Sequence, residues 1–89
     1  MNTEIVSKKE SKSVKTEKKH LVLFNDNDNT FDHVINLLVK VCKHDAIQAE
    51  QCAFLVHYKG KCTVKSGAIE ELSIIAEILA DNGLTVEIN

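Results

Sequence analysis

Residues 56–65 read VHYKGKCTVK, and this stretch decides the fold because it joins the end of a helix to the start of a strand. Upstream of it, Asp45 and Gln48 have the spacing of a capping box, which predicts a helix start. Gly60 is typical of the residue that ends a helix. Polar and apolar residues then alternate from Lys61 to Lys65, as expected of a half-buried strand. The apolar face of the predicted helix comprises Ala49, Cys52, Ala53 and Val56.

The segments on either side of this stretch predict four further elements. A short apolar run at residues 21–24 predicts a buried strand, and the polar residues 25–29 predict a loop. A first helix is expected from about Thr30 to Lys43, and a third helix over residues 69–82 that stops at Gly83. Alternation at residues 84–88 predicts a last strand. The chain is therefore expected to be α+β, in the order strand, helix, helix, strand, helix, strand, with a three-stranded antiparallel sheet covered by helices.

Length and composition limit the chain to one small domain. It has 89 residues, of which 44% are hydrophobic and 27% charged, values typical of a folded globular protein. Residues 1–19 lack apolar periodicity and are expected to be a disordered N-terminal extension, leaving residues 20–89 as the folded core. No run of 18 apolar residues and no secretory signal is found, so we expect a cytoplasmic protein without a membrane partner.

Charge argues against nucleic acid as a partner. Residues 1–19 carry six Lys and three Glu, a net charge of +3, whereas residues 20–89 carry five Lys and ten acidic residues, a net charge of −5. The chain contains no Arg, the residue best suited to bidentate contacts with phosphate or guanine. We therefore expect no nucleic-acid partner.

The cysteines and histidines are the residues that could bind a metal ion or provide a thiol nucleophile. Cys42, Cys52 and Cys62 form no CxxC pair, and the first two fall on predicted apolar helix faces. We interpret them as reduced, buried thiols rather than as zinc ligands, a disulfide framework or a nucleophile beside His57. Neither a metal nor another cofactor is expected, and the chain is not expected to be an enzyme.

The loop Asn25-Asp26-Asn27-Asp28-Asn29 offers several oxygen acceptors. It lacks the central Gly and distant Glu of a calcium loop. Taken alone it is most often a solvated turn, but carboxylate and amide oxygens could also hold a small cation such as an ammonium group. Taken alone, His57 would be a partly buried histidine with its hydrogen bonds satisfied. Neither the loop nor His57 indicates a binding site by itself, and only the two together do so.

Three segments together resemble the ClpS family of adaptors for AAA+ proteases. They are Leu23-Phe24-Asn25-Asp26, Thr30-Phe31-Asp32 and Val56-His57-Tyr58-Lys59-Gly60-Lys61. The resemblance covers about residues 20–89. It implies that Asn25, Asp26 and Asn27 stand at the three positions of the family's Asn-Asp-Asp loop, and that His57 helps them bind a substrate α-amine. It also implies a hydrophobic pocket with Phe31 at the mouth and walls formed by Ala53, Val56 and Leu84.

The resemblance further implies a non-enzymatic function. ClpS-like adaptors bind the free α-amine and the bulky first side chain (Leu, Phe, Tyr or Trp) of N-degron substrates, and deliver them to a ClpA- or ClpC-type unfoldase. The N-terminal extension would engage that unfoldase. The alternative is a small protein-interaction module of the ribosomal stalk type, which has a similar α+β shape without amine recognition.

Overall fold

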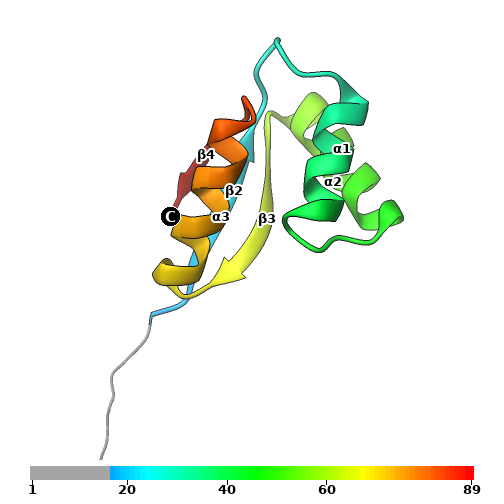
Figure 1. Ribbon diagram of the computed structural model, residues 1–89. Helices are drawn as coiled ribbons and strands as arrows, with labels where there is room; N and C mark the ends of the chain where they lie inside the picture. The colour runs from blue at the N-terminus through cyan, green and yellow to red at the C-terminus, as the bar shows by residue number, and fades with distance from the viewer. Residues whose placement is uncertain (1–16) are drawn as a thin grey trace, which may run out of the picture.

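Six elements follow one another along residues 17–89, which are the residues that the computed structural model describes. In chain order they are β2 (Lys19–Phe24), α1 (Phe31–Lys40), α2 (Ala46–Lys59), β3 (Lys61–Gly67), α3 (Ile69–Asp81) and β4 (Thr85–Ile88) (Figure 1). The predicted order of strands and helices is confirmed. Most of the predicted N-terminal extension lies outside the described residues, although Lys19 already belongs to β2.

The three strands form one antiparallel sheet in the order β3-β2-β4. Strand β2 is central, and its last residue, Phe24, pairs with Lys61 of β3 and Thr85 of β4. The end of β2 and the starts of β3 and β4 therefore meet at one edge of the sheet. The predicted α+β class with a three-stranded antiparallel sheet is confirmed.

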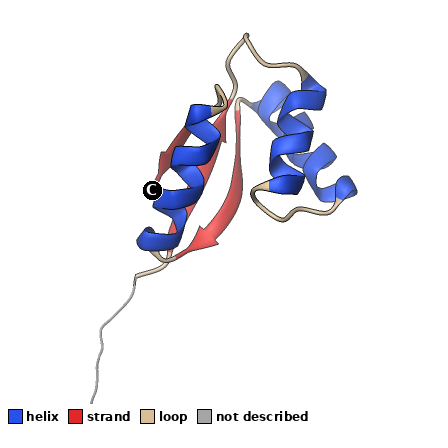
Figure 2. Ribbon diagram, viewed as in Figure 1, coloured by secondary structure: helices blue, strands red, loops and turns tan. Residues whose placement is uncertain are grey.

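The helices divide into two groups, as Figure 2 shows: α3 lies across β2 and β4, and the α1–α2 pair lies beside β3. Helix α2 begins and ends where the sequence predicts. Asp45 accepts a hydrogen bond from the backbone N–H of Gln48 at 2.7 Å, and Gly60 closes the helix with a left-handed φ of 94°. Among residues 17–89, no helix is long and apolar enough to cross a membrane.

Helix α1 ends earlier than predicted, at Lys40 rather than near Lys43. Lys43 adopts a left-handed φ of 64°, and the N–H of His44 turns back to the carbonyl of Leu38 at 3.1 Å. A left-handed residue just past the last turn is typical of a helix end. The apolar spacing continues to Cys42 because that residue still points into the core after the helix has stopped.

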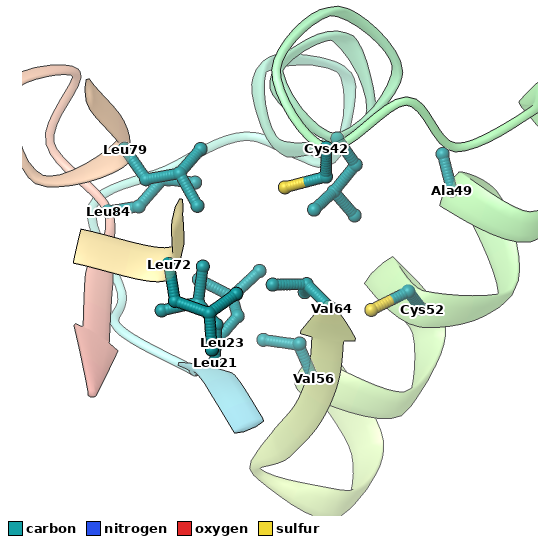
Figure 3. Packing of buried hydrophobic residues seen from close by; sticks show 11 residues of the cluster. Leu21, Leu23, Cys42, Ala49, Cys52, Val56, Val64, Leu72, Leu79 and Leu84 are labelled. Carbon is teal, nitrogen blue, oxygen red and sulfur yellow. The ribbon is translucent and has the colours of Figure 1, made fainter. Parts of the chain in front are cut away.

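One hydrophobic cluster joins all three helices to the sheet (Figure 3). Leu21 and Leu23 of β2 belong to it together with Leu72 and Leu79 of α3, and all four are at most 1% exposed. Alternate residues of a strand share one face, so this face of β2 carries the core. The cluster also contains Leu38, Cys42, Ala49, Cys52, Val56, Val64 and Leu84.

A buried histidine lies beside this cluster. The Nε2 atom of His44 is 2.7 Å from the carbonyl oxygen of Val64, so Nε2 carries the proton and donates it. The other ring nitrogen, Nδ1, is buried and has no hydrogen-bond partner among residues 17–89. His44 thus links the turn between α1 and α2 to β3.

Candidate functional site

A pocket lies at the sheet edge where β2 ends and β4 begins. Its empty space, which includes open solvent at the mouth, is about 360 Å³. Four segments form its wall: the end of β2 with its following loop, the start of α1, the last turns of α2, and the residue before β4. The lining residues are Leu23, Phe24, Asn25, Asp26, Asn29, Thr30, Phe31, Val34, Ala53, Val56, His57 and Leu84.

The inner wall of the pocket is apolar. Ala53 and Val56 lie one helical turn apart on the buried face of α2, and they are 3% and 6% exposed. Leu23 and Leu84 complete this wall from the sheet side and are also buried. Such a surface accommodates a hydrophobic side chain and offers no hydrogen-bonding group to a polar one.

The polar wall is the loop between β2 and α1. The N–H of Asn25 donates to the carbonyl of Gly60 at 2.9 Å, which fixes the loop against the end of α2. Since Gly60 caps the helix three residues after His57, this contact brings Asn25 to the same rim as the histidine. Asn25 and His57 are both exposed at that rim, so their polar atoms are accessible to a ligand.

Three contacts attach the loop and the start of α1 to the first residue of β4 and to the turn before it. Asn29 Nδ2 donates to the carbonyl of Gly83 at 3.0 Å, and Thr85 Oγ1 donates to Asp26 Oδ2 at 3.1 Å. His33 Nε2 lies 2.9 Å from the carbonyl oxygen of Asn82, to which it donates. The conformation of the loop therefore depends on residues more than 45 positions away in the sequence.

Asp26 is the most constrained polar residue of the pocket. Its Oδ1 accepts hydrogen bonds from Asn29 Nδ2 at 2.8 Å and from the N–H of Asp28 at 3.1 Å. Partial burial alone would raise the pKa of Asp26, but the bonds from Asp28, Asn29 and Thr85 outweigh it and hold the pKa below its ordinary value of 3.8. The carboxylate is therefore ionised at neutral pH.

The mouth of the pocket carries four ring side chains, which we call the aromatic rim: Phe31, Phe54, His57 and Tyr58. Phe31 contacts Phe54 edge to face with ring centroids 4.9 Å apart, and His57 contacts Tyr58 in the same way at 4.9 Å. Phe54 and Tyr58 are stacked at 5.8 Å. Phe31 and His57 also line the pocket, so the rim begins at its opening.

Seven of the eight residues predicted for the site line this pocket. The exception is Asn27, which is exposed and lies outside the lining. The lining also contains five residues that were not predicted from the sequence: Leu23, Phe24, Asn29, Thr30 and Val34. Leu23, Phe24 and Thr30 stand within the segments that carried the resemblance. Asn29 and Val34 lie outside those segments, and they reach the pocket because of how the loop and α1 pack in the folded chain.

The cysteines lie in the core rather than in the pocket lining. Burial raises the pKa of the Cys42 thiol to about 11, an effect that the charge of Lys65 partly offsets. Burial also raises the pKa of Cys52, as does a hydrogen bond with Cys62. Cys62 differs from the expected buried thiol because it is only partly buried. Within residues 17–89 no group of three or more His, Cys, Asp or Glu side chains is placed to hold a metal ion.

The pocket combines two features in one opening. One wall is apolar and buried, and the rim offers an ionised carboxylate, an amide oxygen and an imidazole as hydrogen-bond acceptors. This combination suits a ligand that has a cationic donor close to a hydrophobic group.

Comparisons with known proteins identify the family and the fold. The model of the family described as "ATP-dependent Clp protease adaptor protein ClpS" matches residues 14–87. The fold is similar to that of Agrobacterium tumefaciens ClpS2 bound to L-phenylalaninamide, with a TM-score of 0.72 and 14% sequence identity, over 84% of this chain and 98% of that chain. A search of curated proteins finds no match. Because the family model covers most of the sequence, the chain belongs to the ClpS family of Clp protease adaptor proteins.

Proposed function

We propose that this adaptor binds the free N-terminus of a protein whose first residue is Leu, Phe, Tyr or Trp. The observation that carries this proposal is the placement of an apolar wall beside acceptor groups in a single pocket. A free N-terminus is the one place in a polypeptide where an ammonium group and a side chain share a Cα atom. The pocket supplies a complementary surface to each of them.

The α-amine is assigned to the acceptor groups at the rim. An ammonium group donates three hydrogen bonds, and Asn25, Asp26 and His57 can each accept one. Oδ1 of Asp26 already accepts two bonds within the loop, so Oδ2 has the greater free capacity. Hydrogen bonds to charged groups contribute about 1.5 to 3 kcal/mol. Asn27 is not assigned to the amine, because its side chain lies outside the pocket lining.

The first side chain is assigned to the apolar wall formed with Ala53, Val56 and Leu84. Burying a Leu or Phe side chain contributes about 1.5 to 3 kcal/mol relative to leaving it exposed. Phe31 at the mouth adds an aromatic edge that can contact the ring of an aromatic ligand. Small or charged first residues would gain less and are expected to bind weakly.

Fluorescence anisotropy with a labelled Phe-initiated peptide tests this proposal. The free peptide is expected to bind, and the same peptide with an acetylated N-terminus is expected to lose most of its affinity, because acetylation removes the charge and two donors. Equal binding of the two peptides would contradict amine recognition. That result is the one expected for an interaction module of the ribosomal stalk type.

The second part of the proposal is delivery of the bound protein to a ClpA- or ClpC-type unfoldase. The basic N-terminal segment, residues 1–16, is proposed to engage that unfoldase, and it lies outside the described residues. A chain without residues 1–16 should keep its peptide affinity but no longer support degradation of a Phe-initiated substrate. The deletion should not extend to Lys19, because that residue belongs to β2. An unchanged degradation rate would overturn the role of the segment.

A further inference from the structure

We infer that Phe54 and Tyr58 form a contact surface for the second residue of the bound N-terminus, with preference for a large apolar or aromatic side chain. This inference rests on the proposed function, since it takes the first residue to occupy the pocket. It adds a specificity determinant that lies outside the pocket lining.

The two side chains are held as a continuous surface along α2. They are four residues apart, so they lie on one face of the helix, and their rings are stacked at 5.8 Å with an interplanar angle of 11°. Phe54 contacts the pocket residue Phe31, and Tyr58 contacts the pocket residue His57. The surface therefore starts where the pocket lining ends.

The distribution of aromatic residues supports a binding role. The chain has only four aromatic residues, three Phe and one Tyr. Phe24 and Phe31 line the pocket, and the other two form this surface. Phe54 remains 45% exposed and Tyr58 72% exposed, so packing between α1 and α2 does not account for them. Aromatic side chains that stay exposed next to a pocket provide large contact areas for a ligand.

Chain connectivity directs the second residue to this surface. Consecutive Cα atoms are 3.8 Å apart, so the second residue must lie at the mouth when the first side chain is inside. The amine leaves the first Cα toward Asn25 and Asp26, and the peptide bond leaves it in a different direction. Phe54 and Tyr58 contact Phe31 and His57, two pocket-lining residues outside the acceptor loop, so they are the rings that a chain leaving the pocket on this side meets.

The chemistry of the surface selects the second side chain. Aliphatic and aromatic groups gain contact area with the ring faces of Phe54 and Tyr58. An acidic side chain would meet the negative ring faces and would also lie near the ionised Asp26. The expected order of affinity is therefore Phe-Leu above Phe-Gly above Phe-Asp, for peptides identical from the third residue onward.

The experiment measures these three peptides by fluorescence anisotropy on the full chain and on two variants, Phe54→Ala and Tyr58→Ala. The wild type should bind Phe-Leu about three- to tenfold more tightly than Phe-Gly, as expected of a leucine side chain that is only partly buried against the two rings. Each variant should reduce that ratio toward one while still binding Phe-Gly. Phe54→Leu should retain part of the preference.

Two matched controls lie on the same helix. Leu55 is 45% exposed like Phe54, and Ile47 is 69% exposed, close to the value of Tyr58, but neither belongs to the aromatic rim. Leu55→Ala and Ile47→Ala should leave the ratio unchanged. A wild type that binds all three peptides equally would overturn this inference and leave the proposed function intact. Failure of every Phe-initiated peptide to bind would instead overturn the proposed function.

Discussion

Thr85 Oγ1 donates a hydrogen bond of 3.1 Å to Asp26 Oδ2, and this bond joins the start of β4 to the acceptor loop across 59 positions of the sequence. It lies on the one carboxylate oxygen that the loop itself does not use, because Oδ1 already accepts from Asp28 and Asn29. Together these bonds fix the orientation of the Asp26 carboxylate, and Oδ2 keeps the capacity to accept a further hydrogen bond. Asp26 has two functions that can be separated: it holds the loop, and it provides negative charge at the pocket.

Asp26→Asn tests the charge without removing the loop contacts. An Asn side chain can still accept from Asp28 and Asn29 through its oxygen, and its Nδ2 can donate to Thr85 Oγ1. We expect the affinity for a Phe-initiated peptide to fall about tenfold or more, because a hydrogen bond to a charged group contributes about 1.5 to 3 kcal/mol. Isothermal titration calorimetry measures the change.

Asp28→Asn is the matched control for that variant. It removes the same charge from the same loop, at an exposed side chain outside the pocket lining. Its affinity should change less than twofold, because exposed charges are screened by solvent and salt. If both variants weaken binding equally, the net charge of the loop matters rather than the position of Asp26.

The lowered pKa of Asp26 predicts how stability depends on pH. Because the folded chain favours the ionised carboxylate, the stabilisation is present above the unfolded value of 3.8 and is lost as pH falls through the folded pKa. Wild type should therefore exceed Asp26→Asn in free energy of unfolding by a constant amount from pH 5 to 7, and by less at pH 3. Urea unfolding at each pH measures this difference. A difference that grows toward low pH would contradict the direction of the pKa shift.

Local patterns in the sequence were sufficient to predict the elements of the fold. The capping residues Asp45 and Gly60 mark α2 because a cap involves only the next few residues. The end of α1 was predicted three residues too late, since the left-handed conformation of Lys43 leaves no mark on apolar spacing. Cys42 continues the pattern although it follows the helix.

The site could be predicted only in part, because its geometry depends on contacts distant in sequence. Residue spacing places Ala53, Val56 and His57 on one end of a helix. It does not show that Asn27 is exposed and lies outside the pocket lining, or that Asn29 bonds to Gly83. The stacking of Phe54 and Tyr58 beside the mouth likewise depends on how α1 packs against α2.

Thiol reactivity should follow burial. Because the pKa of Cys42 is raised to about 11, only about one in a thousand of its side chains is ionised to the reactive thiolate at pH 8. Cys42 and Cys52 are both buried, whereas Cys62 is partly exposed. We expect iodoacetamide to modify Cys62 first and the other two only after denaturation. Peptide mapping by mass spectrometry identifies the modified residue, and rapid modification of Cys42 in the folded chain would contradict its placement in the core.

Ala53→Met tests whether residue 53 limits the depth of the pocket. Ala53 is 3% exposed and lines the apolar wall, so a longer side chain must occupy ligand space or displace its neighbours. Overpacking costs about 1 to 3 kcal/mol, and the cost should be greatest for the largest ligand. We therefore expect Trp-initiated peptides to lose affinity relative to Leu-initiated ones.

Competition anisotropy with peptides that differ only in the first residue measures that selectivity. A thermal melt of the variant provides the necessary control, because Ala53 also belongs to the buried face of α2. Equal loss of affinity for Leu, Phe and Trp, together with a lowered melting temperature, would mean that residue 53 supports the helix rather than the pocket. A selective loss for Trp at an unchanged melting temperature would place the methionine side chain in the space that the first residue of the substrate occupies.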